Sequence, residues 1–200
     1  MKKSSLSILI ISLFIFGFIF PQDLEYVGTH KCQTCHKSNK KGAQYKVWAE
    51  SKHAKAFDAL LSDKAIAIGK EKKLALPPSE SPECLECHTV GYGEGGYEVK
   101  EASFWNPAPE DKSAVKAMER MEGLKNVGCE MCHGAGNDYK KKKIMEGIYA
   151  GELKAEDFGL VKKTPEETCL KCHNKRSPSF KAFNYDERVK EIAHPFPEGM

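Results

Sequence analysis

The sequence lacks a strong charge of either sign. Its 31 basic and 28 acidic side chains leave a formal net charge of +3 over 200 residues. Because binding to the phosphate backbone usually needs a clear excess of lysine and arginine, this balance gives no support to a nucleic-acid partner. The chain is also poor in hydrophobic residues, which make up 40% of it. We therefore expect something other than side chains to fill part of the interior.

A long apolar run is also missing. The longest run, Leu6–Phe20, follows a basic start and has about 15 residues, whereas a helix that spans a bilayer needs about 20. This pattern is typical of a secretory signal, although no pair of small residues marks a cleavage site after it. Residues 1–22 are therefore either a signal peptide or an uncleaved N-terminal anchor. In both cases we expect residues 23–200 to be periplasmic or otherwise exported, and membrane-anchored if the segment is retained.

No cysteine stands alone. All eight occur in pairs with the spacing Cys-x-x-Cys, and a histidine directly follows every pair. With 7 histidines in 200 residues, chance would place four of them so on the order of once in a million. The four anchors, in chain order, are Cys32/Cys35 with His36, Cys84/Cys87 with His88, Cys129/Cys132 with His133, and Cys169/Cys172 with His173.

Three interpretations of this motif compete. An even number of cysteines in an exported chain is often a disulfide framework, and paired Cys-x-x-Cys motifs can bind zinc. Neither needs a histidine after every pair. Covalent attachment of haem c uses every part of the motif, because the thiols add to the porphyrin vinyl groups and the histidine becomes the proximal iron ligand. The motif therefore predicts four haem c groups in a tetrahaem cytochrome c domain, residues 23–200.

The remaining sequence favours short helices and loops. Proline-rich residues 77–82 are expected to be a linker, and glycine-rich residues 91–97 a turn or small hairpin. The predicted fold class is mainly α, with helices and loops wrapped around four packed haems and little sheet. The expected helices are residues 40–61 with His53 on the apolar face, 113–125 with Ser113 as a possible N-cap, a helix that starts at 164–167 and carries the fourth anchor, and 184–193.

Too few histidines remain to close every iron. Four are proximal ligands, and His30, His53 and His194 are the candidates for distal ligands. An iron with two histidines suits electron transfer, whereas an iron with an empty sixth position binds small molecules. His30 stands two residues before Cys32 and cannot easily reach the far side of its own haem. At least one iron is therefore open, or is closed by methionine, lysine or water.

Four stretches of the chain resemble the tetrahaem cytochrome c-554 family. They are KCQTCHKSNKKGAQYKVWAESKHAKAF, CLECHTVGYGEGGY, VGCEMCHGAG and ETCLKCHN, in the family's order, and the resemblance extends from about Val27 to His194. It implies a periplasmic electron carrier with a largely helical fold and stacked haem pairs. It also implies that three haems have two histidine ligands, that His53 and His194 are distal ligands, and that His88 belongs to an open haem.

The chain departs from the family after the third anchor. The family's third distal histidine lies there, and this chain has Lys140–Lys143, Ile144 and Met145 instead. Three kinds of side chain could replace this distal histidine as an iron ligand, namely His30, Met145 or one of the lysines. If none of them binds, a second iron is open.

Two functions follow from these expectations. The first is an electron carrier that exchanges electrons with redox partner proteins, either donor and acceptor cytochromes or a multihaem oxidoreductase. The second is a reductase or sensor for NO or a related nitrogen oxide at the open iron. A reductase needs proton donors near His88, and the sequence offers only Glu83, Glu86 and Tyr92. We therefore favour the carrier over an enzyme.

Overall fold

The computed structural model describes residues 25–194, which form short helices and loops and contain no strand. Its one isolated β-bridge within these residues joins Thr89 to Lys125. The mainly α class is confirmed. The elements are α1 (His30–His36), η1 (Asn39–Lys41), α2 (Gln44–Glu50), η2 (His53–Lys55), α3 (Ala56–Leu60), α4 (Asp63–Glu71), α5 (Pro82–His88), η3 (Ala102–Trp105), α6 (Lys112–Gly123), α7 (Cys129–His133), α8 (Lys142–Tyr149), η4 (Glu156–Phe158), α9 (Glu166–Leu170) and α10 (Tyr185–Ile192).

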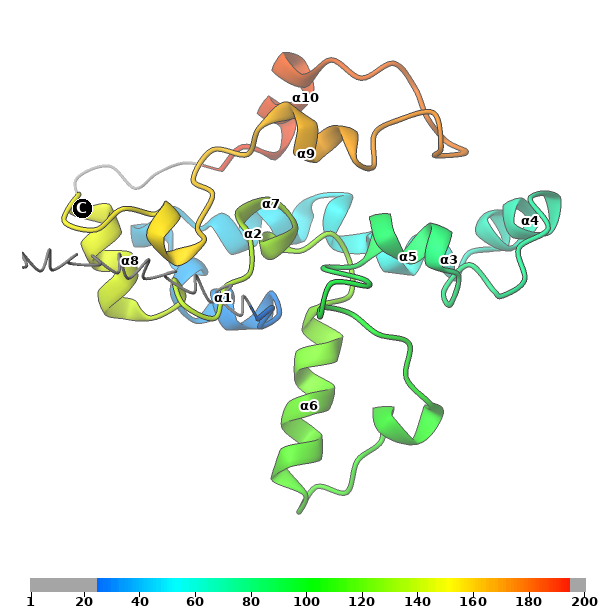
Figure 1. Ribbon diagram of the computed structural model, residues 1–200, viewed down its shortest axis with the longest axis horizontal. Helices are drawn as coiled ribbons and strands as arrows, with labels where there is room; N and C mark the ends of the chain where they lie inside the picture. The colour runs from blue at the N-terminus through cyan, green and yellow to red at the C-terminus, as the bar shows by residue number, and fades with distance from the viewer. Residues whose placement is uncertain (1–24, 195–200) are drawn as a thin grey trace, which may run out of the picture.

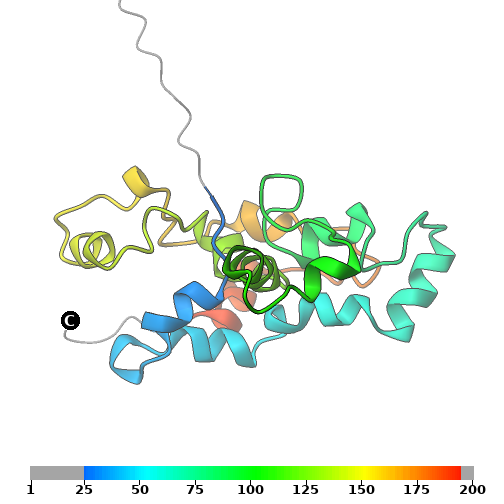
Figure 2. The ribbon, with the colours of Figure 1, turned by 90° about the horizontal axis from the view of Figure 1, so that it is seen from below.

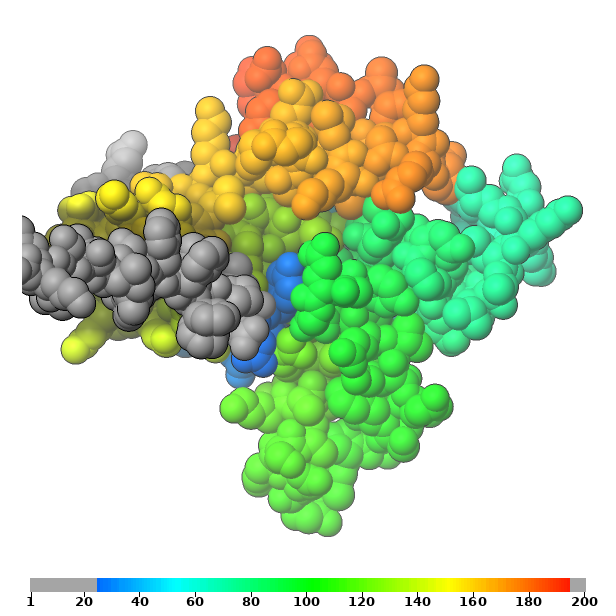
Figure 3. Space-filling model, in the orientation of Figure 1, coloured from blue at the N-terminus to red at the C-terminus, as the bar shows by residue number. Residues whose placement is uncertain are grey.

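The helices form an elongated body with one projecting arm. Helices α1, α2, α7, α5, α3 and α4 follow the long axis, and α8 and α4 lie at its two ends (Figure 1, Figure 2). Helix α6 and η3 project from the middle of this row, and the segment that carries α9 and α10 covers another side of it (Figure 1, Figure 3). No helix in residues 25–194 has the length and apolar character that a membrane crossing requires. The predicted signal or anchor at residues 1–22 lies outside the described residues.

The side-chain core is divided into two small clusters, as the low apolar content leads us to expect. The larger one lies where α3, α5, the 91–97 turn and α6 meet, and the smaller one involves α8 and η4. The larger cluster consists of Phe57, Leu60, Leu85, Val90, Tyr97, Met121 and Leu124. The smaller consists of Tyr139, Ile148 and Ala155. Neither cluster gathers the four anchors around it.

The expectation of one helix over residues 40–61 is wrong. Gly42 takes a left-handed conformation with φ of 89° before α2, and Ser51 is extended with ψ of 162° after it. The chain then continues as η2 and α3 along a loop that precedes the third anchor. There the His53 carbonyl accepts a bond of 3.1 Å from the Val127 N–H, and the Asn126 side chain accepts one of 2.8 Å from the Phe57 N–H. These long-range bonds compensate for the backbone bonds lost at the break.

The other expected elements are close to those observed. Helix α6 is capped by Asp111, whose carboxylate accepts from the Ser113 and Ala114 N–H groups at 3.1 and 2.9 Å, so the expected Ser113 cap is wrong. The carboxylate also accepts from the Ser113 hydroxyl, which explains why the serine is present but does not cap. Helix α9 ends before the fourth anchor does, and α10 matches its expected range within one residue at each end.

The glycine-rich segment after the second anchor is a turn without strands. The Gly96 N–H donates to the Gly91 carbonyl, and the Tyr97 N–H donates to the Val90 carbonyl at 2.8 Å. Gly91 has a φ of +63°, and a Cβ atom there would lie 2.5 Å from the Tyr26 ring. Glycine is therefore required at this position, both for the turn and for the approach of the aromatic ring.

Candidate haem c sites

Each anchor lies on or next to a short helix. Helices α1, α5 and α7 contain their complete motifs, and α9 contains the first cysteine of the fourth. Residues three and four positions apart lie on the same helix face. The two thiols and the histidine of one motif therefore project to the same side, as attachment to one porphyrin requires. All eight thiols are free and partly buried.

Three proximal histidines are oriented by an oxygen acceptor at Nδ1. The His88 Nδ1 lies 2.5 Å from the Ala56 carbonyl, and the His133 Nδ1 lies 2.6 Å from the Val161 carbonyl. The His36 Nδ1 lies 3.1 Å from the Gln44 Oε1. Because these oxygens only accept, Nδ1 carries the hydrogen in each case, and the lone pair of the neutral ring is on Nε2. A hydrogen bond of this kind on the far nitrogen fixes the ring orientation and prepares the histidine to bind a metal through Nε2.

His173 is oriented in another way. Its ring stacks on Phe183 with 4.6 Å between centroids and 21° between planes. Among the described residues its ring nitrogens have no hydrogen-bond partner. Partial burial lowers the pKa of His173, which favours the neutral ring that a metal binds.

Two of the predicted proximal histidines each have the ring of a second histidine close by, at 63° for His53 and His173 and at 46° for His133 and His194. The ring centroids are 6.0 Å apart for His53 and His173, and 5.8 Å apart for His133 and His194. Two imidazoles that bind one iron from opposite sides, each through a bond of about 2 Å, have ring centres about 6 Å apart. Partial burial lowers the pKa of His53 and of His194, which favours the neutral ring that binds a metal. The donor set therefore fits haem c.

The anchors come together in two groups. The thiols of Cys32 and Cys129 lie next to each other, and their interaction raises the pKa of Cys32 and lowers that of Cys129. The same contact between Cys87 and Cys172 lowers the pKa of Cys87 and raises that of Cys172. We call the first and third anchors the α1/α7 site, and the second and fourth anchors the α5/α9 site.

Glu130, inside the third anchor, has a structural role that the sequence did not indicate. Its side chain is only 2% exposed. Its carboxylate accepts from the backbone N–H groups of Val27, Gly28 and Gly136, at 2.9, 2.8 and 2.7 Å. Burial raises the pKa of this carboxyl, and the three N–H donors act against that rise. Glu130 therefore ties the segment before α1 to α7 and fixes the first anchor beside the third.

The glycines around the third anchor were a signal for this contact. A Cβ atom at Gly136 would lie 3.0 Å from the Glu130 Oε1, and one at Gly128 would lie 2.1 Å from the Thr29 Oγ1. Closely spaced glycines often indicate that another group approaches the backbone. An acidic residue between them indicates which group that is.

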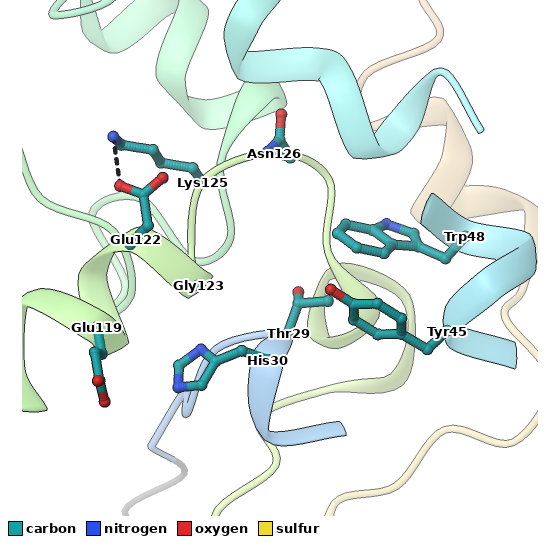
Figure 4. A pocket seen from close by; sticks show the side chains of 9 residues that line it. All are labelled: Thr29, His30, Tyr45, Trp48, Glu119, Glu122, Gly123, Lys125 and Asn126. Carbon is teal, nitrogen blue, oxygen red and sulfur yellow. Dashed lines mark ion pairs between the residues drawn. The ribbon is translucent and has the colours of Figure 1, made fainter. Parts of the chain in front are cut away.

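His30, the first residue of α1, does not lie beside any of the four proximal histidines in the ring contacts of the described residues. It lines a cavity of about 410 Å³ between α1, α2 and the end of α6 (Figure 4). Its Nε2 is buried and has no hydrogen-bond partner within the described part of the chain. The residues around the cavity are Thr29, His30, Tyr45, Trp48, Glu119, Glu122, Gly123, Lys125 and Asn126.

Comparisons with known proteins point to a family of multihaem cytochromes. A family model described as cytochrome c554 and c-prime matches residues 31–106, which include the first two anchors and His53. Cytochrome c-554 of Nitrosomonas europaea is 28% identical over 197 residues, covering 85% of this chain and 74% of the relative. The solved structure of reduced cytochrome c554 from that organism matches with a TM-score of 0.52 and 27% identity, over 85% of this chain and 79% of that one. The similarity therefore extends well beyond the anchor motifs.

Proposed function

Because the chain belongs to the cytochrome c-554 family of haem c electron-transfer proteins, we propose that it holds four haem c groups and works as an exported, periplasmic electron carrier. Residues 23–200 form the tetrahaem domain, and residues 1–22 direct its export or anchor it. The observation that carries the proposal is the pair of facing imidazoles, His53 with His173 and His133 with His194. Haem c supplies an iron that gains or loses one electron.

The side chains of the protein set the conditions for this exchange. His53 and His194 occupy the positions opposite two proximal histidines, so no substrate has room to bind between the rings. The carbonyls of Ala56 and Val161 hold the rings of His88 and His133 in one tautomer. The Glu130 carboxylate, which accepts from the Val27, Gly28 and Gly136 N–H groups, would hold the first anchor beside the third, so that electrons could pass between the two haems.

The partners proposed for this carrier are redox proteins, either donor and acceptor cytochromes or a multihaem oxidoreductase. The balanced charge of the chain, +3 overall, favours short-lived contacts over strong electrostatic attraction to one partner. Such contacts suit a carrier that must bind and release two partners in turn.

The proposal is tested by haem content and by electron uptake. The full chain is produced in a host with a c-type maturation system and is analysed by intact mass and by the pyridine haemochrome spectrum. We expect four covalent haems, four electrons in a reductive titration and at least two low-spin signals in the EPR spectrum of the oxidised protein. Free thiols without a Soret band would contradict haem binding, and fewer than four haems would contradict the count.

A second function is favoured by one observation at His88. All seven histidines of the sequence lie in the described residues, and none of them faces His88 as His53 faces His173. The iron held there is open in this proposal, and NO or a related nitrogen oxide is its candidate ligand. However, Glu83 is exposed and bonded to Ser81 at 2.6 Å, and Glu86 is exposed and paired with Arg176 at 2.9 Å.

The carrier is therefore preferred to the reductase, since neither glutamate is placed as a buried proton donor. Mixing the reduced protein with NO separates the two functions. A carrier binds NO without consuming it, whereas a reductase oxidises its haems as NO disappears. The rate of NO loss is measured for the wild-type protein at several pH values. Proton-coupled reduction of NO slows as the pH rises, whereas simple binding of NO does not.

A further inference from the structure

We infer that the iron of the first anchor, held by Cys32, Cys35 and His36, has no histidine on its distal side and binds a small neutral ligand such as CO. This inference rests on the proposed function, since it assumes haem c at the first anchor. It differs from the expectation, implied by the family resemblance, that three of the four haems have two histidine ligands. The chain would then have two open irons, one in the α1/α7 site and one in the α5/α9 site.

The number of histidines leaves one candidate for the distal position. Two facing pairs account for His53, His173, His133 and His194. The other three histidines are His30 and the proximal ligands His36 and His88. His194 also lies within electrostatic range of His36, but its ring contact is with His133, so His30 is the histidine left for the first iron.

The geometry of α1 prevents His30 from doing so. His30 and His36 are the first and last residues of this seven-residue helix. A separation of six residues corresponds to a rise of about 9 Å and a net rotation of about 240° beyond one full turn. A distal ligand must approach the iron from the side opposite to the proximal ligand. One short, straight helix cannot supply both ligands to the same iron.

The surroundings of His30 lead to the same conclusion. Its ring packs against the backbone of α6, and a Cβ atom at Gly123 would lie 2.2 Å from the His30 Nδ1. Figure 4 shows the ring directed toward Glu119 and the cavity that Tyr45 and Trp48 close on the far side. None of the cavity's lining residues is a cysteine or a proximal histidine. His30 therefore shares this cavity with no side chain that would attach haem or bind iron on the proximal side.

Met145, Lys141 and Lys142 are engaged elsewhere, and Lys140 and Lys143 are exposed. Met145, on α8, packs against the cluster of Tyr139, Ile148 and Ala155. Among the nearby lysines, Lys141 pairs with Asp138 at 3.3 Å and Lys142 with Glu146 at 3.6 Å, and both lysines are largely exposed. These contacts direct the side chains into an apolar cluster or toward solvent.

The α1/α7 site and the α5/α9 site would then have the same pattern of iron ligands. In the α1/α7 site, His194 makes its ring contact with His133, and the described residues show no ring contact between a histidine and His36. In the α5/α9 site, His173 is faced by His53 and His88 is not. Each site therefore combines one iron suited to electron transfer with one iron that accepts an external ligand.

The test is the CO stoichiometry of the reduced holoprotein, after intact mass has established the number of haems. We expect two CO per four haems from Soret difference spectra, and the same value for His30→Ala. One CO per four haems in the wild-type protein would overturn the inference. A rise from one to two in His30→Ala, or in Met145→Leu, would then identify the side chain that closes the first iron.

Assignment to the first anchor uses a second variant. Cys32→Ser/Cys35→Ser removes one haem, and CO binding is expected to fall from two per protein to one. If two CO still bind, the open iron belongs to another anchor and the inference is wrong. If this variant does not fold, the wild-type and His30→Ala titrations still test the inference, because one CO per four haems would mean that no second iron is open. A haem count below four would contradict the proposed function instead, which keeps the two failures distinct.

Discussion

Leu85 and Glu130 occupy the same position, directly after the first cysteine, in the second and the third anchor. Both are buried, with 0% and 2% of their surface exposed, but their surroundings differ. Leu85 packs in the apolar cluster that α3, α5 and α6 share. Glu130 accepts three backbone hydrogen bonds from Val27, Gly28 and Gly136.

The comparison teaches that the anchor motif does not determine how its site is held together. The α5/α9 site is supported by apolar packing, which depends on volume and tolerates some rearrangement. The α1/α7 site depends on one buried carboxylate whose partners are fixed backbone groups. Loss of that acceptor leaves several buried donors unpaired, and these cannot rearrange easily. The two sites should therefore respond differently to matched substitutions.

The largest spectroscopic change is expected from the facing histidines. Each substitution would remove one ligand from an iron and leave that iron open. His194→Ala should open the iron of the α1/α7 site that His133 holds, and His53→Ala should open the iron of the α5/α9 site that His173 holds. Each variant should gain one high-spin EPR signal and one CO, while all four haems remain attached. An unchanged spectrum in either variant would show that the histidine only packs there.

Replacement of the buried carboxylate is expected to have the next largest effect. Glu130→Leu keeps a similar size but removes the acceptor of three buried N–H groups, and should lower the free energy of unfolding by about 3–5 kcal/mol. Denaturant unfolding of the oxidised protein measures this change. Gln33→Leu, at the same motif position of the first anchor, is the matched control and should stay within about 0.5 kcal/mol. Equal effects in the two variants would contradict the role of Glu130.

Shortening the apolar side chain at the equivalent position should cost less. Leu85→Ala removes a fully buried side chain from a packed cluster and should lower the free energy of unfolding by about 2–4 kcal/mol. Leu170→Ala, at the same position of the fourth anchor, serves as the control because Leu170 is 41% exposed. Leu170→Ala should therefore change the free energy of unfolding only slightly. A cost at Leu85 no greater than that at Leu170 would show that the α5/α9 site does not depend on this cluster.

The smallest effect is expected at the surface of the α5/α9 site. Arg176 pairs with Glu86 at 2.9 Å, but their side chains are 65% and 40% exposed. An exposed pair of this kind contributes about 0.5 kcal/mol or less. Arg176→Gln should therefore change stability by no more than that, and the difference should vanish in 1 M salt. A larger, salt-independent loss would mean that the pair positions the fourth anchor.

Much of each anchor could be predicted from the sequence because it depends on local geometry. The spacing of Cys129, Cys132 and His133 puts three groups on one helix face. Hydrophobic periodicity was less reliable over residues 40–61, where Ser51 interrupts the helix. Tertiary hydrogen bonds overrode the helical pattern there, because Asn126 and Val127 bond to the backbone where the helix is interrupted. A pattern of apolar residues contains no information about such distant partners.

The amino-acid sequence by itself determined the number of anchors, their order and the shortage of histidines. These follow from residue identity and short-range spacing, which need no knowledge of the fold. Only the tertiary structure decided that His53 faces His173, that His194 faces His133 and that His30 faces neither His36 nor His88. The physical reason is that a distal ligand reaches its site through space from a distant part of the chain. Its position depends on how the loops pack, and Glu130 shows that a single buried side chain can fix that packing.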